Sequence, residues 1–393
     1  MASNPTREAL LARGALLLAA TAVLAACSAS DGDTAGTSTS GEAATTSTAR
    51  PPAVAYPGEE WAVASPAELG FRPASLTALA AQAEAAGSSC LVVVRDGVVV
   101  IDERWPGPEP TPREAFSVTK SLTSTLVGIA VDRGELALDG SAAEHVPEWQ
   151  GTAAEAVTVA DLLANVSGRH WDLATDYRAM AAEAQDKTGF AIGLGQDDSP
   201  GTVWAYNNSA IQTLDAVLES ATGETPQALA LERVFGPLGM DDSEMSLDAA
   251  GNTLTFMGLQ TTCLDLARYG HLMLNEGRWE DQQVVSEAFV VAATGRSSSE
   301  LNAAYGYLWW LNREGIVGSP GLATGGGEAT PAESQLLRAA PDDVFWALGF
   351  NDQVVAVIPS EGIVAVRLGA KPPAEAPFGF SELTTGVLDA VAP

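Results

Sequence analysis

Apolar residues near the start of the folded region change from helical to alternating spacing. Residues 73–86 follow a helical period and are followed by a glycine. Two apolar, β-rich runs come next, at 90–94 and 98–103, separated by Arg95-Asp96-Gly97. Asp-Gly between two such runs is a strong hairpin signal. We therefore expect a helix followed by two antiparallel strands.

The middle of the chain is mostly helical, and its last third returns to strands. A long, largely apolar helix begins at Ser117 and ends near Gly134. Strand patterns at both ends with helices between them predict an α+β fold, in which one sheet carries an inserted helical lobe at about 121–280. A cleft between two lobes is a usual place for a small-molecule site. The other expected helices are 159–164, 209–222, 226–235 and 262–275, and the later strands are 305–311, 344–350, 354–359 and 363–368.

The first residues have the features of a targeting segment. Two arginines precede a small, apolar run at 14–26, which is too short for a conventional transmembrane helix. Leu24-Ala25-Ala26-Cys27 resembles the bacterial lipobox, which implies a signal peptide over 1–26, cleavage before Cys27 and lipid on its thiol. The alternative is an ordinary signal peptide with an incidental cysteine. Residues 27–56 are small and polar and predict a flexible tether to a domain at 57–390. We expect an extracytoplasmic protein, lipid-anchored to the bacterial cell membrane.

Composition narrows the classes of partner. The formal net charge is −30, which argues against nucleic acid and against electrostatic binding to anionic lipid. The three histidines are scattered and no CxxC or HExxH motif occurs, so neither a metal site nor a cofactor is expected. Cys90 and Cys263 can form a disulfide outside the cytoplasm, and the sequence leaves paired and unpaired states equally open.

Ser117-Val118-Thr119-Lys120 has the spacing of an activated nucleophile. Residues three apart share a helix face, so the Ser117 hydroxyl and the Lys120 amine can touch. A lysine in an apolar helix loses solvation, its pKa falls, and it can act as a base. The Ser117 backbone N–H, at the start of the helix, is free to stabilise an oxyanion. The alternative is a capped helix with a surface lysine.

Tyr206-Asn207-Asn208 places a phenol and an amide two positions apart in a loop before the next helix. A tyrosine near a cationic lysine can have a depressed pKa and pass a proton from serine to leaving group. Asn208 can bond Lys120 or the substrate carbonyl. The alternative is an aromatic side chain packed under a turn, with an asparagine that merely caps the helix.

These two motifs resemble the S-x-x-K and Y-x-N motifs of the serine β-lactamase-related family. That family includes class C β-lactamases, D,D-peptidases, family VIII carboxylesterases and 6-aminohexanoate-dimer hydrolases. The resemblance implies a β-lactamase/transpeptidase-like fold, an antiparallel sheet flanked by helices with an inserted all-helical lobe. It also implies Ser117, Lys120 and Tyr206 as catalytic residues. Further similar segments, in the correct order, are 161–168, 237–240, 265–270 and 305–310.

The third family motif, a cation and a glycine on a strand after Y-x-N, is altered. Lys187-Thr188-Gly189 precedes Tyr206 and is therefore treated as a decoy. In the segment that has the right order, Gly349 matches the motif glycine and Ala347 stands in place of the cation. The Phe350 N–H would then be the second oxyanion donor. Without the cation the usual anchor for a substrate carboxylate is missing, which favours neutral esters and amides.

Two residues near these motifs have open orientations or roles. Asp352 would add negative charge if it faces the cleft. Tyr177 lies roughly where the aminohexanoate-type members have a substrate-contacting tyrosine, and a structural surface tyrosine is the alternative.

Together the residues predict a serine hydrolase that cleaves a small ester or amide through an acyl-enzyme on Ser117. A D,D-peptidase or β-lactamase that acts on penicillin-like or cell-wall substrates is one alternative. A non-catalytic surface binding protein is another. No G-x-S-x-G motif occurs, so an α/β-hydrolase nucleophile elbow is excluded.

Overall fold

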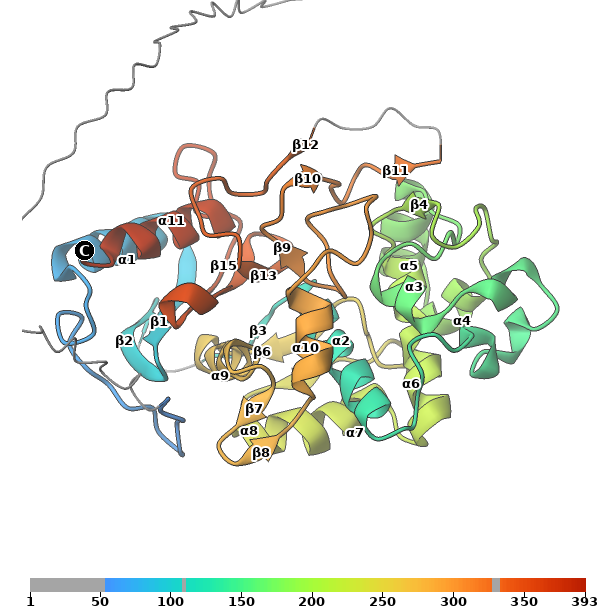
Figure 1. Ribbon diagram of the computed structural model, residues 1–393, viewed down its shortest axis with the longest axis horizontal. Helices are drawn as coiled ribbons and strands as arrows, with labels where there is room; N and C mark the ends of the chain where they lie inside the picture. Colours follow the sequence, from blue (N-terminus) through green and yellow to red (C-terminus); the bar gives the residue numbers. More distant parts are fainter. Residues whose placement is uncertain (1–53, 108–110, 327–332) are drawn as a thin grey trace, which may run out of the picture. The chain divides into compact units, whose positions relative to one another are not determined.

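Segments from both ends of the chain form one antiparallel sheet, as the sequence predicts. The computed structural model describes residues 54–107, 111–326 and 333–393. The main sheet has six strands in the order β2-β1-β15-β14-β13-β9 (Figure 1). The N-terminal hairpin, β1 (Ser88–Arg95) and β2 (Val98–Arg104), joins the C-terminal strands because β1 pairs with β15 (Ile363–Gly369). The expected α+β class is therefore confirmed.

Helices bury the central strands of this sheet. Strand β14 (Gln353–Ile358) is buried at every position, and its side chains point alternately to the two faces. Both faces are therefore covered at this strand. Helices α1 (Pro73–Ala85) and α11 (Phe380–Ala390) pack against each other and against the sheet, and α9 (Cys263–Leu274) also packs on it (Figure 1).

Helix α2 (Val118–Asp132) joins the sheet to the lobe. Its first thirteen residues are all buried. It contacts β13 (Phe345–Gly349) and β14, and also α6 (Leu214–Thr222), α7 (Pro226–Ala230) and α10 (Glu287–Thr294). Gly128 permits the close approach of α10, because a Cβ at this position would lie 2.4 Å from the Phe289 ring. A fully buried helix in this position holds its N-terminal residues rigidly.

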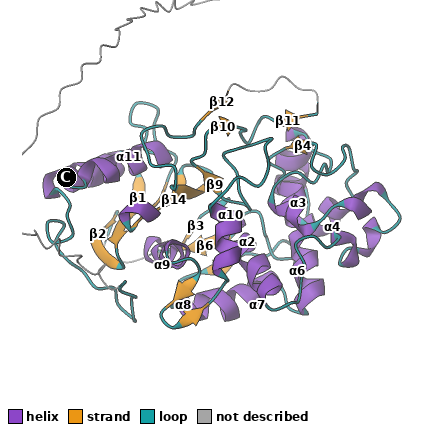
Figure 2. Cartoon of the chain, in the orientation of Figure 1, coloured by secondary structure: helices purple, strands orange, loops and turns teal. Residues whose placement is uncertain are grey.

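The lobe is mainly helical but is not wholly so. In Figure 2 it is drawn mostly as helices and loops, with a few very short strands. The expected helix 209–222 is divided at Thr213 into two. Its helices are the 3-10 helices η1 (Ala142–Glu144), η2 (Pro147–Trp149) and η3 (Ala153–Ala156), then α3 (Val159–Leu163), the π-helix η4 (Ala174–Glu183), α4 (Lys187–Ile192), α5 (Asn208–Gln212), α6 (Leu214–Thr222), α7 (Pro226–Ala230), the π-helix η5 (Leu231–Phe235) and α8 (Gly236–Leu238), besides α2 and α9. The short strands are β4 (Val203–Trp204), β5 (Glu244–Met245), β6 (Leu259–Thr261), β7 (Arg278–Trp279) and β8 (Gln282–Gln283), and β6 also pairs with β3 (Arg113–Glu114).

The expected strand 305–311 is wrong for most of its length. Only β9 (Trp310–Leu311) is a strand. Leu308 has a φ of 60°, and its N–H bonds the Gly306 carbonyl, so the chain turns here and cannot extend. The aromatic residues of this segment pack into the core instead of forming a ladder.

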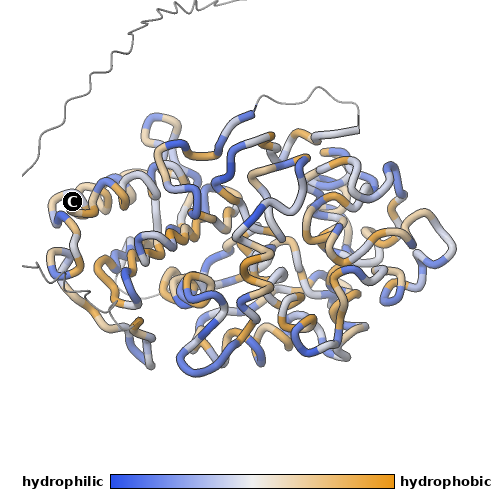
Figure 3. Tube along the Cα trace, in the orientation of Figure 1, coloured by the Kyte–Doolittle hydropathy of each residue, from blue (hydrophilic) through white to orange (hydrophobic). Residues whose placement is uncertain are grey.

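Hydrophilic residues concentrate in connections such as the β7–β8 hairpin (Figure 3).

The N-terminal predictions lie largely outside the described residues. Cys27, the signal peptide and residues 27–53 of the tether are among these, and they stay predictions. Residues 54–56 were expected in the tether, but Ala55 and Tyr56 pack on the domain. The Ala55 carbonyl lies 2.8 Å from His271 Nε2, and the Tyr56 ring lies 5.3 Å from the His271 ring. No helix in the described part of the chain is long and apolar enough to cross a membrane.

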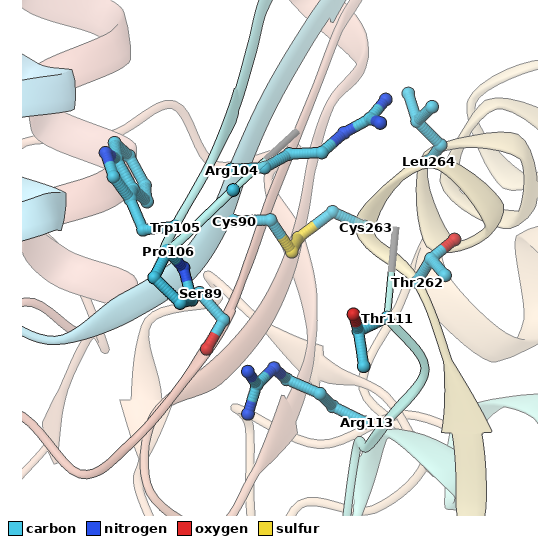
Figure 4. A pocket seen from close by; sticks show the side chains of 11 residues that line it. Ser89, Cys90, Arg104, Trp105, Pro106, Thr111, Arg113, Thr262, Cys263 and Leu264 are labelled. Carbon is cyan, nitrogen blue, oxygen red and sulfur yellow. A yellow bond between two sulfur atoms is a disulfide. The ribbon is translucent and has the colours of Figure 1, made fainter. Parts of the chain in front are cut away.

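A disulfide links the sheet to α9. The two cysteines that form it are Cys90 and Cys263. A cavity of about 230 Å³ lies beside the disulfide, and the Arg104, Trp105 and Arg113 side chains are among those that line it (Figure 4). Ser117 is not among its lining residues.

Candidate active site

The turn before Ser117 is held by a half-buried carboxylate, Glu114, that the sequence did not single out. Phe116 has a φ of 50°, an uncommon conformation for a bulky residue. Its N–H donates to Glu114 Oε1 (3.1 Å), which also accepts from the Gly258 N–H (2.7 Å). Gln260 Nε2 donates to the other carboxylate oxygen (2.7 Å). Glu114 thus ties the nucleophile turn to the segment around Gly258.

The Ser117 hydroxyl and the Lys120 amine are in direct contact. Lys120 Nζ lies 2.8 Å from Ser117 Oγ, and the lysine side chain is only 1% exposed. Burial lowers the pKa of Lys120 to about 7, although nearby Asp176 acts to raise it. A substantial neutral fraction at neutral pH makes this amine a competent base for the serine proton.

A second acceptor fixes the lysine amine. Lys120 Nζ also donates a hydrogen bond to the Phe256 carbonyl (2.8 Å). No sequence motif indicated this contact, because its acceptor is a backbone oxygen. The amine lies 4.8 Å from the centre of the Tyr206 ring and 5.6 Å from that of Phe256. Two acceptors and two aromatic rings therefore define the position of Nζ.

Tyr206 lies at the site, but the expected depressed pKa is wrong. Burial raises the pKa of Tyr206, and the hydrogen bond with the Ser117 side chain opposes this only in part. The ring stacks on Trp310 at 5.8 Å, and the Trp171 indole N–H donates to the Tyr206 carbonyl (3.1 Å). Tyr206 is therefore a neutral phenol at neutral pH, able to donate one proton and accept another.

Asn208 bonds Asp176 and not Lys120. Its Nδ2 donates to Asp176 Oδ2 (2.7 Å), and its backbone N–H donates to the same oxygen (3.1 Å). No hydrogen bond between Asn208 and Lys120 occurs within the described residues. The neighbouring Asn207 caps α5 by accepting from the Ala210 N–H, as the alternative interpretation of this loop expected. Asn208 thus fixes the loop.

Gly349 and Phe350 lie against the nucleophile turn. A Cβ at residue 349 would lie 2.2 Å from the Ala115 carbonyl, so only glycine allows this approach. The Phe350 ring lies 5.6 Å from the Phe116 ring, one residue before Ser117. Neither the Ser117 nor the Phe350 backbone N–H donates to another backbone group in the described ranges. Both are free to serve as oxyanion donors.

The strand lacks a cation, and the other expected charges lie elsewhere. Ala347 is fully buried in β13. Asp352 turns toward α11, because its Oδ1 lies 2.8 Å from where a Cβ of Gly379 would stand. Lys187 begins α4 and bonds the Ala184 carbonyl with its amine (2.6 Å). The Lys187-Thr188-Gly189 sequence is therefore part of helix α4 in the lobe.

Tyr177 lies beside Tyr206 and is partly open to solvent. Its side chain is 41% exposed, and its hydroxyl donates to the Pro320 carbonyl (3.4 Å). Burial of the hydroxyl end and the charge of Asp176 raise the pKa of Tyr177 to about 12. Leu173, one helical turn earlier, and Leu322, two residues after Pro320, are also exposed apolar residues. An apolar surface therefore lies around Tyr177.

The tryptophans around the site differ in burial. Trp204, Trp309 and Trp346 are fully buried in the core, whereas Trp171 is half-buried at the Tyr206 loop. Among the residues that the structure describes, no three His, Cys, Asp or Glu side chains are grouped to hold a metal ion.

Comparison with known proteins places this arrangement in a family. The beta-lactamase family profile matches residues 76–380. A D-aminopeptidase from Cereibacter sphaeroides is 29% identical over 40% of this chain and 32% of its own length. A 6-aminohexanoate-dimer hydrolase from Paenarthrobacter ureafaciens is 26% identical over 60% of this chain and 67% of its own. Esterase EstB from Burkholderia gladioli is 32% identical over 35% and 39%, respectively.

Structural similarity extends over most of the domain. A protein from Bacillus anthracis assigned as a 6-aminohexanoate-dimer hydrolase superposes with a TM-score of 0.65 at 19% identity, over 85% of this chain and 86% of that one. This likeness confirms the expected fold. The chain spans only about a third of the length of the D-aminopeptidase, but the family profile spans well over half of the chain. The resemblance seen in the two motifs is therefore confirmed, and the chain belongs to the beta-lactamase family.

Proposed function

We propose that this protein is a serine hydrolase that cleaves small, neutral esters or amides through an acyl-enzyme on Ser117. The contact between Ser117 Oγ and the buried Lys120 amine, 2.8 Å apart, carries the proposal. A surface lysine that merely follows a helix cap would be solvated and fully protonated at neutral pH. Burial of Lys120 supports its role as base.

In the acylation step, neutral Lys120 accepts the Ser117 proton as Oγ bonds the substrate carbonyl carbon. The Ser117 and Phe350 N–H groups hold the oxyanion. Tyr206 donates its phenolic proton to the leaving oxygen or nitrogen as the bond to carbon breaks, and recovers a proton from Lys120. Water then attacks the acyl carbon and gives its proton to Lys120 through Tyr206. Ser117 regains a proton, and the acid is released.

The substrate class follows from charge and exposure around the serine. Ala347 supplies no cation for a carboxylate, and Asp352 turns toward α11. Phe350, 68% exposed beside the nucleophile turn, and Tyr177 present apolar surface instead. A neutral ester with an apolar acyl or alcohol group fits these surroundings. Relatives named as an esterase and as a 6-aminohexanoate-dimer hydrolase support this substrate class.

The proposal extends to location. The lipobox-like sequence before Cys27 supports lipid anchoring on the outer side of the bacterial cell membrane. The Cys90–Cys263 disulfide fits an oxidising compartment. Globomycin, an inhibitor of lipoprotein signal peptidase, should leave an uncleaved precursor in cells that express the chain. Identical processing of a Cys27→Ala variant would overturn the anchoring part.

The catalytic part is tested by hydrolysis of p-nitrophenyl butyrate. Ser117→Ala should reduce the rate to that of the uncatalysed reaction, whereas Ser124→Ala in the same helix should retain most of it. An unchanged rate in Ser117→Ala would overturn the proposal.

A further inference from the structure

We propose that Asp176 is a positioning residue that holds the Tyr206–Asn208 loop, whose Tyr206 ring lies 4.8 Å from the Lys120 amine. This inference rests on the proposed function of Ser117 and adds a residue to its machinery. Nothing in the two motifs indicates Asp176, which precedes Tyr177 in the lobe and is 1% exposed.

Four hydrogen bonds converge on the Asp176 carboxylate. Asn208 donates its backbone N–H (3.1 Å) and its Nδ2 (2.7 Å) to Oδ2. Ser209 donates its backbone N–H (2.7 Å) and its hydroxyl (2.8 Å) to Oδ1. A protonated carboxyl would need an acceptor for its own proton, so four donors match the ionised form. Asp176 therefore binds the start of α5, directly after Tyr206, as a carboxylate.

Asp176 lies near the start of a π-helix. Asp176 lies in the π-helix η4, and its N–H donates to the Asp172 carbonyl (2.9 Å). π-Helical turns occur often at functional sites. The same element presents Tyr177 on the surface beside the site. One short segment thus supports both the proton-handling loop and the apolar surface.

Asp176 also acts on the lysine through its charge. Its negative charge raises the pKa of Lys120, against the larger effect of burial. The other titratable groups that face Lys120 are Tyr206 and, behind it, Tyr177 and Tyr305. Raised pKa values keep these three phenols neutral across the range from about pH 5 to pH 9. Burial raises the pKa of Asp176, and the hydrogen bonds from Ser209 and Asn208 oppose this effect and favour its ionised form. In that form Asp176 partly balances the charge of Lys120.

The test compares Asp176→Asn with Asp172→Asn in the full chain. Both remove one carboxylate from the same segment, but Asp172 bonds Thr175 and His170 and makes no bond to the loop. In Asp176→Asn we expect kcat for a neutral p-nitrophenyl ester to fall by about 10- to 100-fold. The midpoint of the rise in kcat/KM with pH should move to lower pH, because the lysine loses its counter-charge. Asp172→Asn should change neither.

A structural role alone would lower the rate without moving the midpoint, so an unchanged midpoint overturns the electrostatic part. Hydrogen exchange over residues 206–210 tests the anchoring part independently of catalysis. Faster exchange is expected in Asp176→Asn, and equal exchange in both variants would overturn it. If Asp176→Asn does not fold, Ser209→Ala removes one of the four bonds and should give faster exchange with the midpoint retained. Failure of fluorophosphonate to label Ser117 in the wild type would instead overturn the proposed function, and this inference with it.

Discussion

Lys120 Nζ lies 2.8 Å from Ser117 Oγ, within a helix whose first thirteen residues are buried. The pair brings a base and a nucleophile into contact without histidine. Other hydrolases activate the base or nucleophile with an ion pair or a metal. Here burial activates the base, because it disfavours the ammonium form of the lysine. The remaining parts of the site serve this pair: Glu114 holds the turn, and Tyr206 lies over the amine.

The pH dependence of hydrolysis follows from Lys120. Its pKa is lowered to about 7, and only the neutral amine accepts a proton. The neutral fraction increases as pH rises through this value, so kcat/KM for a neutral ester should rise with a midpoint near 7. Lys120→Arg stays protonated and should lose about 10³-fold in kcat. A wild-type profile that is flat from about pH 5 to pH 9 would contradict lysine as the base.

Tyr206→Phe removes the phenol but keeps the ring that stacks on Trp310 at 5.8 Å. We expect kcat to fall by about 100-fold with KM little changed, because the phenol acts in proton transfer and not in binding. Stopped-flow kinetics with p-nitrophenyl butyrate measures the rates of acylation and of deacylation. Turnover within twofold of the wild type would show that the proton takes another route.

Phe350→Ala tests the apolar surface, since the backbone N–H of residue 350 is retained. The kcat/KM ratio of p-nitrophenyl octanoate to p-nitrophenyl acetate should fall by about tenfold, as expected for loss of about 1.4 kcal/mol of apolar contact. Leu231→Ala, an equally exposed apolar residue in η5, is the matched control and should leave the ratio unchanged. Equal ratios in all three proteins would place the acyl chain elsewhere.

The Cys90–Cys263 disulfide joins residues 173 positions apart. It should stabilise the fold because it lowers the conformational entropy of the unfolded chain. Replacing both cysteines by alanine should lower the free energy of unfolding by about 2–4 kcal/mol. Urea denaturation of the double variant and of the oxidised wild type measures the difference. Identical midpoints would mean that the bond contributes nothing to stability.

Much of the fold was predictable because its patterns are local. The helix at 73–85, the hairpin at Asp96-Gly97 and the strands after residue 344 each have a spacing or turn that the structure reproduces. The strand expected at 305–311 failed because the same aromatic residues fit a buried turn as well as a strand. Sequence spacing does not report the positive φ of Leu308 that decides between them.

The site residues also differ in whether local sequence patterns predict them. Ser117 and Lys120 were predictable because residues three apart share a helix face, and Tyr206 was predictable because its motif resembles that of a known family. Glu114, Asp176 and the Phe256 carbonyl were not, since each acts through contacts between segments far apart in the sequence. The pKa of Tyr206 was predicted in the wrong direction, because the sequence shows a nearby lysine but not the depth of burial.

Intact-mass labelling of the full chain with a fluorophosphonate, and separately with a penicillin, tests the central claim most directly. We predict a single fluorophosphonate adduct on Ser117 that is absent in Ser117→Ala. We predict neither a stable penicillin adduct nor penicillin hydrolysis, since no cation is present on β13. Penicillin acylation of Ser117 would indicate a peptidase or β-lactamase instead. Absence of any adduct on Ser117 would contradict the proposed hydrolase and favour a binding protein.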